Sequence, residues 1–139
     1  MLCEHGFCHG FQMMDKHESP RTAFDILTTR FRTPPKVVVY DNCCKLHAMA
    51  LKREPHRFRK TKFLVDRFHS KGHTCSAGYH MDTYHKDKKI REINSQLCEQ
   101  LNARLINLNS QIACMSSDNA IVHSSMFLGI RNLDINNFQ

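Results

Sequence analysis

The sequence lacks long apolar runs, and this absence excludes a class of protein. No apolar run approaches the roughly 20 residues that a membrane-spanning helix needs, so we expect no association with a membrane. The first ten residues, MLCEHGFCHG, contain no basic segment followed by an apolar one, so we also expect no signal peptide. The chain has no tryptophan, no internal repeat and no low-complexity segment.

Paired cysteine motifs are absent as well. There is no CxxC, so the sequence matches no standard zinc-finger pattern. Seven cysteines is an odd number, which argues against a closed disulfide framework, and without secretion the thiols should stay reduced. Ten histidines accompany these cysteines, which raises the question of metal binding.

The composition is that of a basic globular protein. The chain has 139 residues, enough for a single domain over 1–139 with a modest core. Hydrophobic residues make up 41% and charged residues 24%, which argues against disorder. The net charge of +7 favours a polyanionic partner, because lysine and arginine can neutralise phosphates.

Hydrophobic patterning predicts an α/β fold, a short mixed sheet flanked by helices. The run KVVVY at 36–40 is β-branched without alternation, as expected for a strand covered on both faces. In chain order the predicted elements are a strand or hairpin remnant at 6–14, a helix at 20–32, the strand at 36–40, a helix at 42–54, a strand at 61–69, a polar insert at 70–92, and C-terminal helices within 93–133, the first of them running from 93 to 115.

Asp41 directly follows the valine-rich strand. Ligand sites in α/β sheets gather at the carboxyl ends of strands, so Asp41 is a candidate metal ligand. The alternative is that it caps the helix that follows, and spacing alone favours capping.

Two further acids stand out. Glu99 points away from the apolar stripe of its predicted helix, as a solvated residue would. Asp66 interrupts an apolar strand, and its simplest role is an ion pair with Arg67 or another base.

Cysteine and histidine form a second group of candidates. Cys44 lies in the helix after Asp41, whereas His69 sits at the edge of the insert, together with His73 and Cys75 within it. Zinc binds these side chains in tetrahedral sets of four, although a free cysteine is more often a small core residue.

Several sequence words occur together in a specific order. They are CEHG, GFQMM and ESPR near the start, then YDNCCKLHAMALKREP, FLVDRFH, GHTCSAGY and INSQLCEQLNA. In these words the chain, from about Cys3 to about Asn132, resembles the Kyakuja–Dileera–Zisupton (KDZ) transposases. The words differ from the family pattern in the shorter gap of HTC and in Cys43, where alanine is more usual.

The resemblance implies part of a ribonuclease H-like fold that binds divalent metal. Asp41 looks like the second catalytic acid and Glu99 like the third, holding Mg²⁺ or Mn²⁺. The first acid of the family would precede CEHG, and Asp15 does not match it. His69, His73 and Cys75 look like the family's Cys/His insert, with Cys44 as a further ligand for Zn²⁺. DNA would be the partner and the nucleus the location, while oligomerisation is left open.

Three functions therefore follow from the sequence. The first is a fragment of a DDE-type DNA transposase, expected to be inactive alone because one catalytic acid is missing. The second is a non-catalytic zinc-containing module that binds nucleic acid or protein. The third is a plain α/β domain whose basic charge only maintains solubility.

Overall fold

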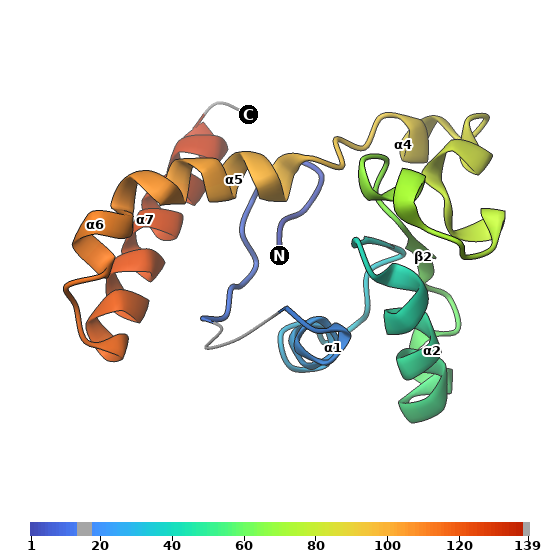
Figure 1. The fold of residues 1–139 in the computed structure, drawn as a ribbon, viewed down its shortest axis with the longest axis horizontal. Coiled ribbons are helices and arrows are strands. Elements are labelled where there is room, and N and C mark those ends of the chain that lie inside the picture. Colours follow the sequence, from blue (N-terminus) through green and yellow to red (C-terminus); the bar gives the residue numbers. More distant parts are fainter. Residues whose placement is uncertain (14–17, 138–139) are drawn as a thin grey trace. The chain divides into compact units, whose positions relative to one another are not determined.

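The computed structural model describes residues 1–13 and 18–137, and Asp15 lies outside this range. The chain forms two compact units where the sequence predicts one domain. One unit contains Met14–Ser95, and the other combines Met1–Met13 with Gln96–Gln139. We call them the central unit and the terminal unit (Figure 1).

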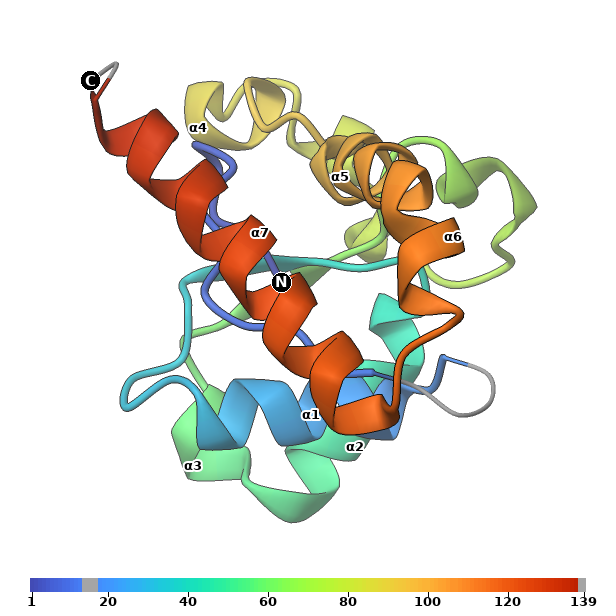
Figure 2. The same ribbon diagram turned by 90° about the vertical axis from the view of Figure 1, so that its left-hand side faces the viewer.

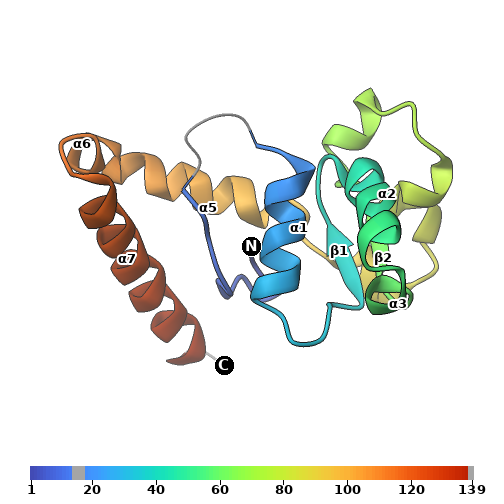
Figure 3. The ribbon, with the colours of Figure 1, turned by 90° about the horizontal axis from the view of Figure 1, so that it is seen from below.

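The central unit is built on a parallel pair of strands. Strand β1 (Val37–Val39) pairs with β2 (Lys62–Leu64) in the register Val38 to Phe63. Helices α2 (Cys43–Arg53) and α3 (Pro55–Phe58) connect the two strands, as a parallel pair requires (Figure 3). The prediction of an α/β arrangement is confirmed in this coarser form, with a two-stranded parallel sheet in place of a larger mixed one.

Both faces of this sheet are covered, which explains the unbroken valine run. On one face, Phe63 lies beside the Phe58 ring, with ring centroids 5.9 Å apart. On the other face, Leu64 packs with Met81 and Ile90, each no more than 1% exposed. Successive residues of a strand point to opposite faces of the sheet, and both faces are buried here. Each valine of the run therefore packs against a core, on one face or the other.

Helix α1 (Pro20–Thr29) packs against α2. Its start follows the predicted signals, because Pro20 occupies the first turn and the Ser19 hydroxyl accepts a hydrogen bond from the Thr22 amide. Leu27 and Leu46 are both 0% exposed and form part of the core of this unit.

The predicted strand at 61–69 ends earlier than expected. Val65 makes only an isolated bridge to His80, and the chain then turns at Asp66. The segment beyond contains short helical turns, namely η1 (His69–Gly72), η2 (Ala77–Tyr79), η3 (Met81–Tyr84) and α4 (Lys88–Arg91). The polar insert is thus ordered by local turns rather than by long elements.

The predicted long helix at 93–115 is interrupted at its start. The Arg67 guanidinium donates to the carbonyl oxygens of Ile93 at 2.9 Å and of Arg91 at 2.8 Å. The Ile93 carbonyl is thus bound by a side chain instead of by a helical amide, and regular helix begins only at α5 (Leu97–Leu105).

The terminal unit is mainly helical. Beyond α5 come η4 (Ile106–Leu108) and α6 (Asn109–Ile112), and the chain then reverses into the long helix α7 (Ser117–Asn137) (Figure 2). The predicted strand at 6–14 is not formed within residues 1–13, where Leu2 and Cys8 make one isolated bridge, and Met14 lies outside the described residues.

Candidate metal site

Cys44 reaches the candidate site from the first turn of α2. Its neighbour Cys43 is 0% exposed, and the Cys43 thiol donates to the Val38 carbonyl oxygen at 3.5 Å. Successive residues of a helix point about 100° apart, so burying Cys43 turns Cys44 toward the outside of the core. Cys44 is half-buried there.

His73 and Cys75 come from the segment that follows η1. The His73 amide donates to the Ser70 carbonyl oxygen at 3.2 Å, and the His73 backbone is extended (φ −92°, ψ 133°). This extended backbone ends η1 and leads the chain past α2. His73 and Cys75, which are separated by one residue, therefore both face Cys44.

The three side chains converge. The His73 Nδ1 atom lies 3.8 Å from Cys44 Sγ and 3.7 Å from Cys75 Sγ. The ligand atoms of all three residues lie within 4.8 Å of one another. This cluster could bind a metal ion such as zinc.

The distances suit tetrahedral zinc. Zn–S bonds of about 2.3 Å and Zn–N bonds of about 2.05 Å at a tetrahedral angle place a sulfur and a nitrogen about 3.6 Å apart. The two sulfur-to-nitrogen distances, 3.8 and 3.7 Å, lie about 0.1–0.2 Å above this spacing. Zinc binds thiolate and imidazole donors well, whereas Mg²⁺ favours oxygen donors. The two cysteines and the histidine therefore suit zinc better than Mg²⁺.

Burial and charge both act on the Cys75 thiol. Partial burial raises the pKa of Cys75, and the neighbouring Cys44 sulfur raises it further, since two thiolates this close repel each other. A divalent cation would reverse that balance by neutralising both thiolates.

His80 also approaches the cluster, and analysis of the sequence missed it. Its Nε2 atom lies 3.8 Å from Cys75 Sγ. The bridge between Val65 and His80, with the Val65 amide donating to the Tyr79 carbonyl oxygen at 2.7 Å, fixes the backbone there. A Cys and a His separated by four residues was the available signal in the sequence.

The structure differs from prediction at His69. This residue is not a member of the three-residue group within the described part of the chain. Instead, its Nδ1 atom lies 2.6 Å from Asp66 Oδ2. Asp66 is only 4% exposed, and its Oδ1 atom also accepts from the amides of Phe68 and His69, so the acid organises the turn after β2. Its basic partner is thus His69 rather than Arg67.

The two predicted catalytic acids lie in different units. Asp41 follows β1 in the central unit, whereas Glu99 is an exposed residue in the first turn of α5 in the terminal unit. The Asp41 carboxylate accepts hydrogen bonds from Asn42, at 2.6 Å from the backbone N–H and 3.3 Å from the side-chain amide. Asn42 precedes α2, so these two bonds do not cap the first turn of the helix. The convergence of Asp41 and Glu99 stays a prediction.

Comparison with protein-family models, with curated proteins and with solved structures finds no match. Within the described residues, no helix is both long and apolar enough to cross a membrane.

Proposed function

We propose that the central unit is a zinc-containing module that binds nucleic acid. The observation that carries this proposal is the meeting of Cys44, His73 and Cys75 within 4.8 Å. Cys44 belongs to α2, and the other two belong to the polar segment beyond η1, so one ion would join them. Zinc would supply folding energy to a segment that has few apolar side chains of its own.

His80 is the fourth ligand in this proposal. Structural zinc sites have four protein ligands, and His80 Nε2 already lies 3.8 Å from one of the sulfurs. The His80 ligand atoms are not within 4.8 Å of those of all three other residues, so zinc binding would have to draw the imidazole toward the ion. The complete set would be two cysteines and two histidines.

The distribution of charge supports nucleic acid as the partner. Met14–Ser95 contains 18 Lys and Arg against 9 Asp and Glu, a formal charge of +9. The rest of the chain contains 2 against 4, a formal charge of −2. The basic charge is therefore concentrated in the unit that has the metal cluster, which favours binding to phosphates over a general role in solubility.

A second candidate function is DNA strand cleavage and transfer of the DDE type, as a fragment of a KDZ-type transposase in the nucleus. Its support is the resemblance together with the position of Asp41, just beyond β1, where catalytic acids of a ribonuclease H-like fold would lie. Asp41 and Glu99 would hold Mg²⁺ or Mn²⁺. The chain alone would be inactive, because two acids under-coordinate a two-metal centre.

Metal analysis of the purified chain tests the zinc module. We expect about one zinc per chain, with Cys44→Ser, Cys75→Ser and His80→Ala each weakening zinc affinity by more than about tenfold. Cys114→Ser is the matched control, because Cys114 is exposed and lies in the other unit. A metal-free preparation would contradict the proposal, and an effect of His69→Ala in place of His80→Ala would contradict the ligand set.

DNA binding is tested separately with a duplex at several salt concentrations. When phosphate contacts hold the complex together, the logarithm of the affinity falls linearly with the logarithm of the salt concentration. Incubation of the same samples with Mg²⁺ or Mn²⁺ tests catalysis, with Asp41→Ala as the control. Metal-dependent cleavage that Asp41→Ala abolishes would contradict the expected inactivity, whereas duplex binding with no salt dependence would contradict the nucleic-acid role.

A further inference from the structure

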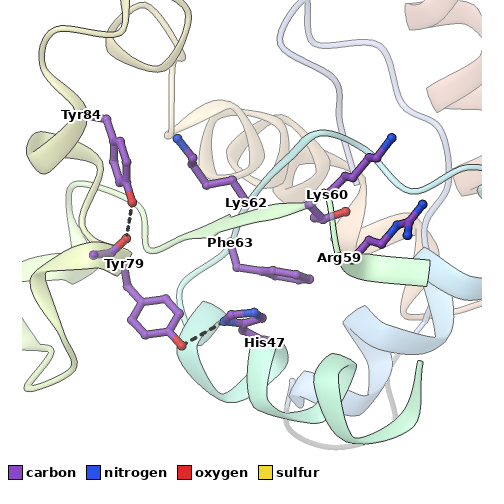
Figure 4. Close-up of a pocket in the computed structure, with 9 residues that line it drawn as sticks. His47, Arg59, Lys60, Lys62, Phe63, Tyr79 and Tyr84 are labelled. Atoms are coloured by element: carbon purple, nitrogen blue, oxygen red, sulfur yellow. Dashed lines mark hydrogen bonds between the residues drawn. The ribbon is translucent and has the colours of Figure 1, made fainter. Parts of the chain in front are cut away.

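The central unit contains a shallow cavity, largely open to solvent, that the proposed metal site does not use. Its volume is about 470 Å³, within the range of about 300–1,000 Å³ typical of ligand pockets. It lies between α2, the turn that joins α3 to β2, β2 itself and the η2–η3 segment, and six of the nine residues that line it are of two kinds (Figure 4). The aromatic ones are Phe63, Tyr79 and Tyr84, and the cationic ones are Arg59, Lys60 and Lys62.

The aromatic walls are held in place. The Tyr79 hydroxyl lies 3.0 Å from His47 Nδ1, and the Tyr84 hydroxyl donates to the Gly78 carbonyl oxygen at 2.9 Å. Phe63 is 4% exposed, and His47 stacks on it with ring centroids 4.8 Å apart. The half-buried rings of Tyr79 and Tyr84 are thus already ordered before a ligand binds, whereas Phe63 forms the buried floor beneath His47.

The cations are available to an anion. Arg59 and Lys60 are exposed, and among the described residues neither forms an ion pair with a carboxylate. Lys62 Nζ lies over the Tyr84 ring, 4.0 Å from its centroid. No carboxylate is among the described residues that line the cavity. A ligand with a flat apolar part and an anionic part would complement both kinds of residue.

We propose that this cavity binds one unpaired nucleotide of a nucleic-acid chain. The base would stack against Tyr84, a place that Lys62 now covers, and the flanking phosphates would contact Arg59 and Lys60 (Figure 4). A base inside a duplex is already stacked and paired, so it cannot enter without being unpaired at a cost. The site therefore selects single-stranded nucleic acid over duplex. This inference rests on the proposed nucleic-acid binding for the identity of the polymer.

The primary experiment compares three probes by fluorescence anisotropy with the full, zinc-loaded chain. They are a labelled thymidine oligonucleotide of about ten residues, a duplex of the same length and an abasic oligonucleotide with the same phosphates. We expect the abasic probe to bind about 5- to 150-fold more weakly than the thymidine probe, the factor expected for stacking of one base. An RNA oligonucleotide of matching sequence is a further probe, because stacking on the base does not depend on the sugar. An affinity that depends on the base, for either DNA or RNA, supports the inference.

Variants separate the two kinds of contact. Tyr84→Leu keeps apolar volume but removes the aromatic face, so it should weaken the thymidine probe and leave the abasic probe unchanged. Lys60→Gln should weaken both probes. The controls are Phe68→Ala and Lys71→Gln, because both residues are exposed in the same unit and neither lines the cavity. Equal losses from Phe68→Ala and Tyr84→Leu would overturn the assignment.

A second measurement needs no variant. The chain has no tryptophan and three tyrosines, of which Tyr79 and Tyr84 line the cavity. Stacking of a base should therefore quench the intrinsic tyrosine fluorescence on addition of the thymidine probe but not of the abasic one. Equal affinity for both probes without quenching overturns the nucleotide site. Salt-dependent duplex binding in the same samples would then leave the proposed function standing, so the two failures are distinguishable.

Discussion

The Oδ2 atom of Asp66 lies 2.6 Å from the Nδ1 atom of His69. The Oδ1 atom of the same carboxylate accepts from the amides of Phe68 at 2.9 Å and His69 at 3.0 Å. One buried acid thus ends β2 and starts the turn that leads to the metal cluster. Its bond to the imidazole also fixes how His69 is oriented.

Replacing Asp66 should therefore cost more than replacing His69. Asp66→Ala leaves two backbone amides without their acceptor, and we expect it to lower the free energy of unfolding by about 3 kcal/mol. His69→Ala loses one side-chain contact and should cost about 1 kcal/mol. Urea unfolding measures both.

Asp82→Ala is the control for that comparison. The Asp82 side chain is 77% exposed, and its ion pair with Arg67, at 3.4 Å, lies at the surface. Its removal should change the free energy of unfolding by less than about 1 kcal/mol. Equal losses in the three variants would show that the Asp66 carboxylate does not organise the turn.

In the terminal unit, Asn132 should hold the N-terminal segment. Its side-chain amide donates to the Cys8 carbonyl oxygen at 2.9 Å and its oxygen accepts from the Cys8 amide at 2.8 Å. Asn132→Leu should accelerate hydrogen exchange of the Cys8 amide and destabilise the unit by about 1–2 kcal/mol. Asn136→Leu, one turn further along α7 and exposed, should leave the exchange unchanged. Similar exchange in both variants would refute the role of Asn132.

Thiol alkylation should separate burial from metal protection. Cys43 is 0% exposed, and burial raises the pKa of its thiol, so it should not react with iodoacetamide in the native protein at pH 8. Exposed Cys114 should react, whereas Cys44 and Cys75 should react only after a chelator removes zinc. Mass spectrometry reads each site. Modification of Cys43 at the rate of Cys114 would contradict its inert core position.

Acid should destabilise the central unit through His47. Burial lowers the pKa of His47 below its usual value of about 6.5, so the folded state favours the neutral imidazole. His47 contributes its full stability above about pH 6.5. This contribution is lost as the pH falls toward the folded pKa, because the imidazole is protonated in the unfolded chain at a pH where it is still neutral in the folded chain. Its share of the slope cannot exceed about 1.4 kcal/mol per pH unit.

Urea unfolding between pH 7.5 and pH 5.5 measures this contribution. Other histidines also titrate in this range, so the informative quantity is the difference between the wild type and His47→Gln. Glutamine cannot be protonated, and its variant should lose less stability on acidification. Parallel stability curves for the two proteins would show that His47 contributes nothing to the acid sensitivity.

Part of the fold could be predicted from local pattern alone. The valine run at 37–39 had to be a strand covered on both faces, and Ser19–Pro20 had to start a helix, because both signals act within a few residues. The long helix expected from residue 93 fails at its beginning for the opposite reason. The carbonyl oxygen of its first residue, Ile93, accepts a hydrogen bond from Arg67, which lies 26 residues earlier in the chain, and no periodicity records such a contact.

The candidate site divides in the same way. Residue chemistry nominated Cys44, His69, His73 and Cys75, since zinc selects thiolates and imidazoles whatever the fold, and three of these four meet in the structure. Choosing between His69 and His80 required the tertiary structure, because Asp66 engages one imidazole and the bridge at Val65 brings the other to Cys75. The nucleotide cavity was not predictable either, as its walls come from α2, β2 and the η2–η3 segment. Sequence determined which side chains can bind a metal or a phosphate, and only the packing of distant segments decided which of them meet.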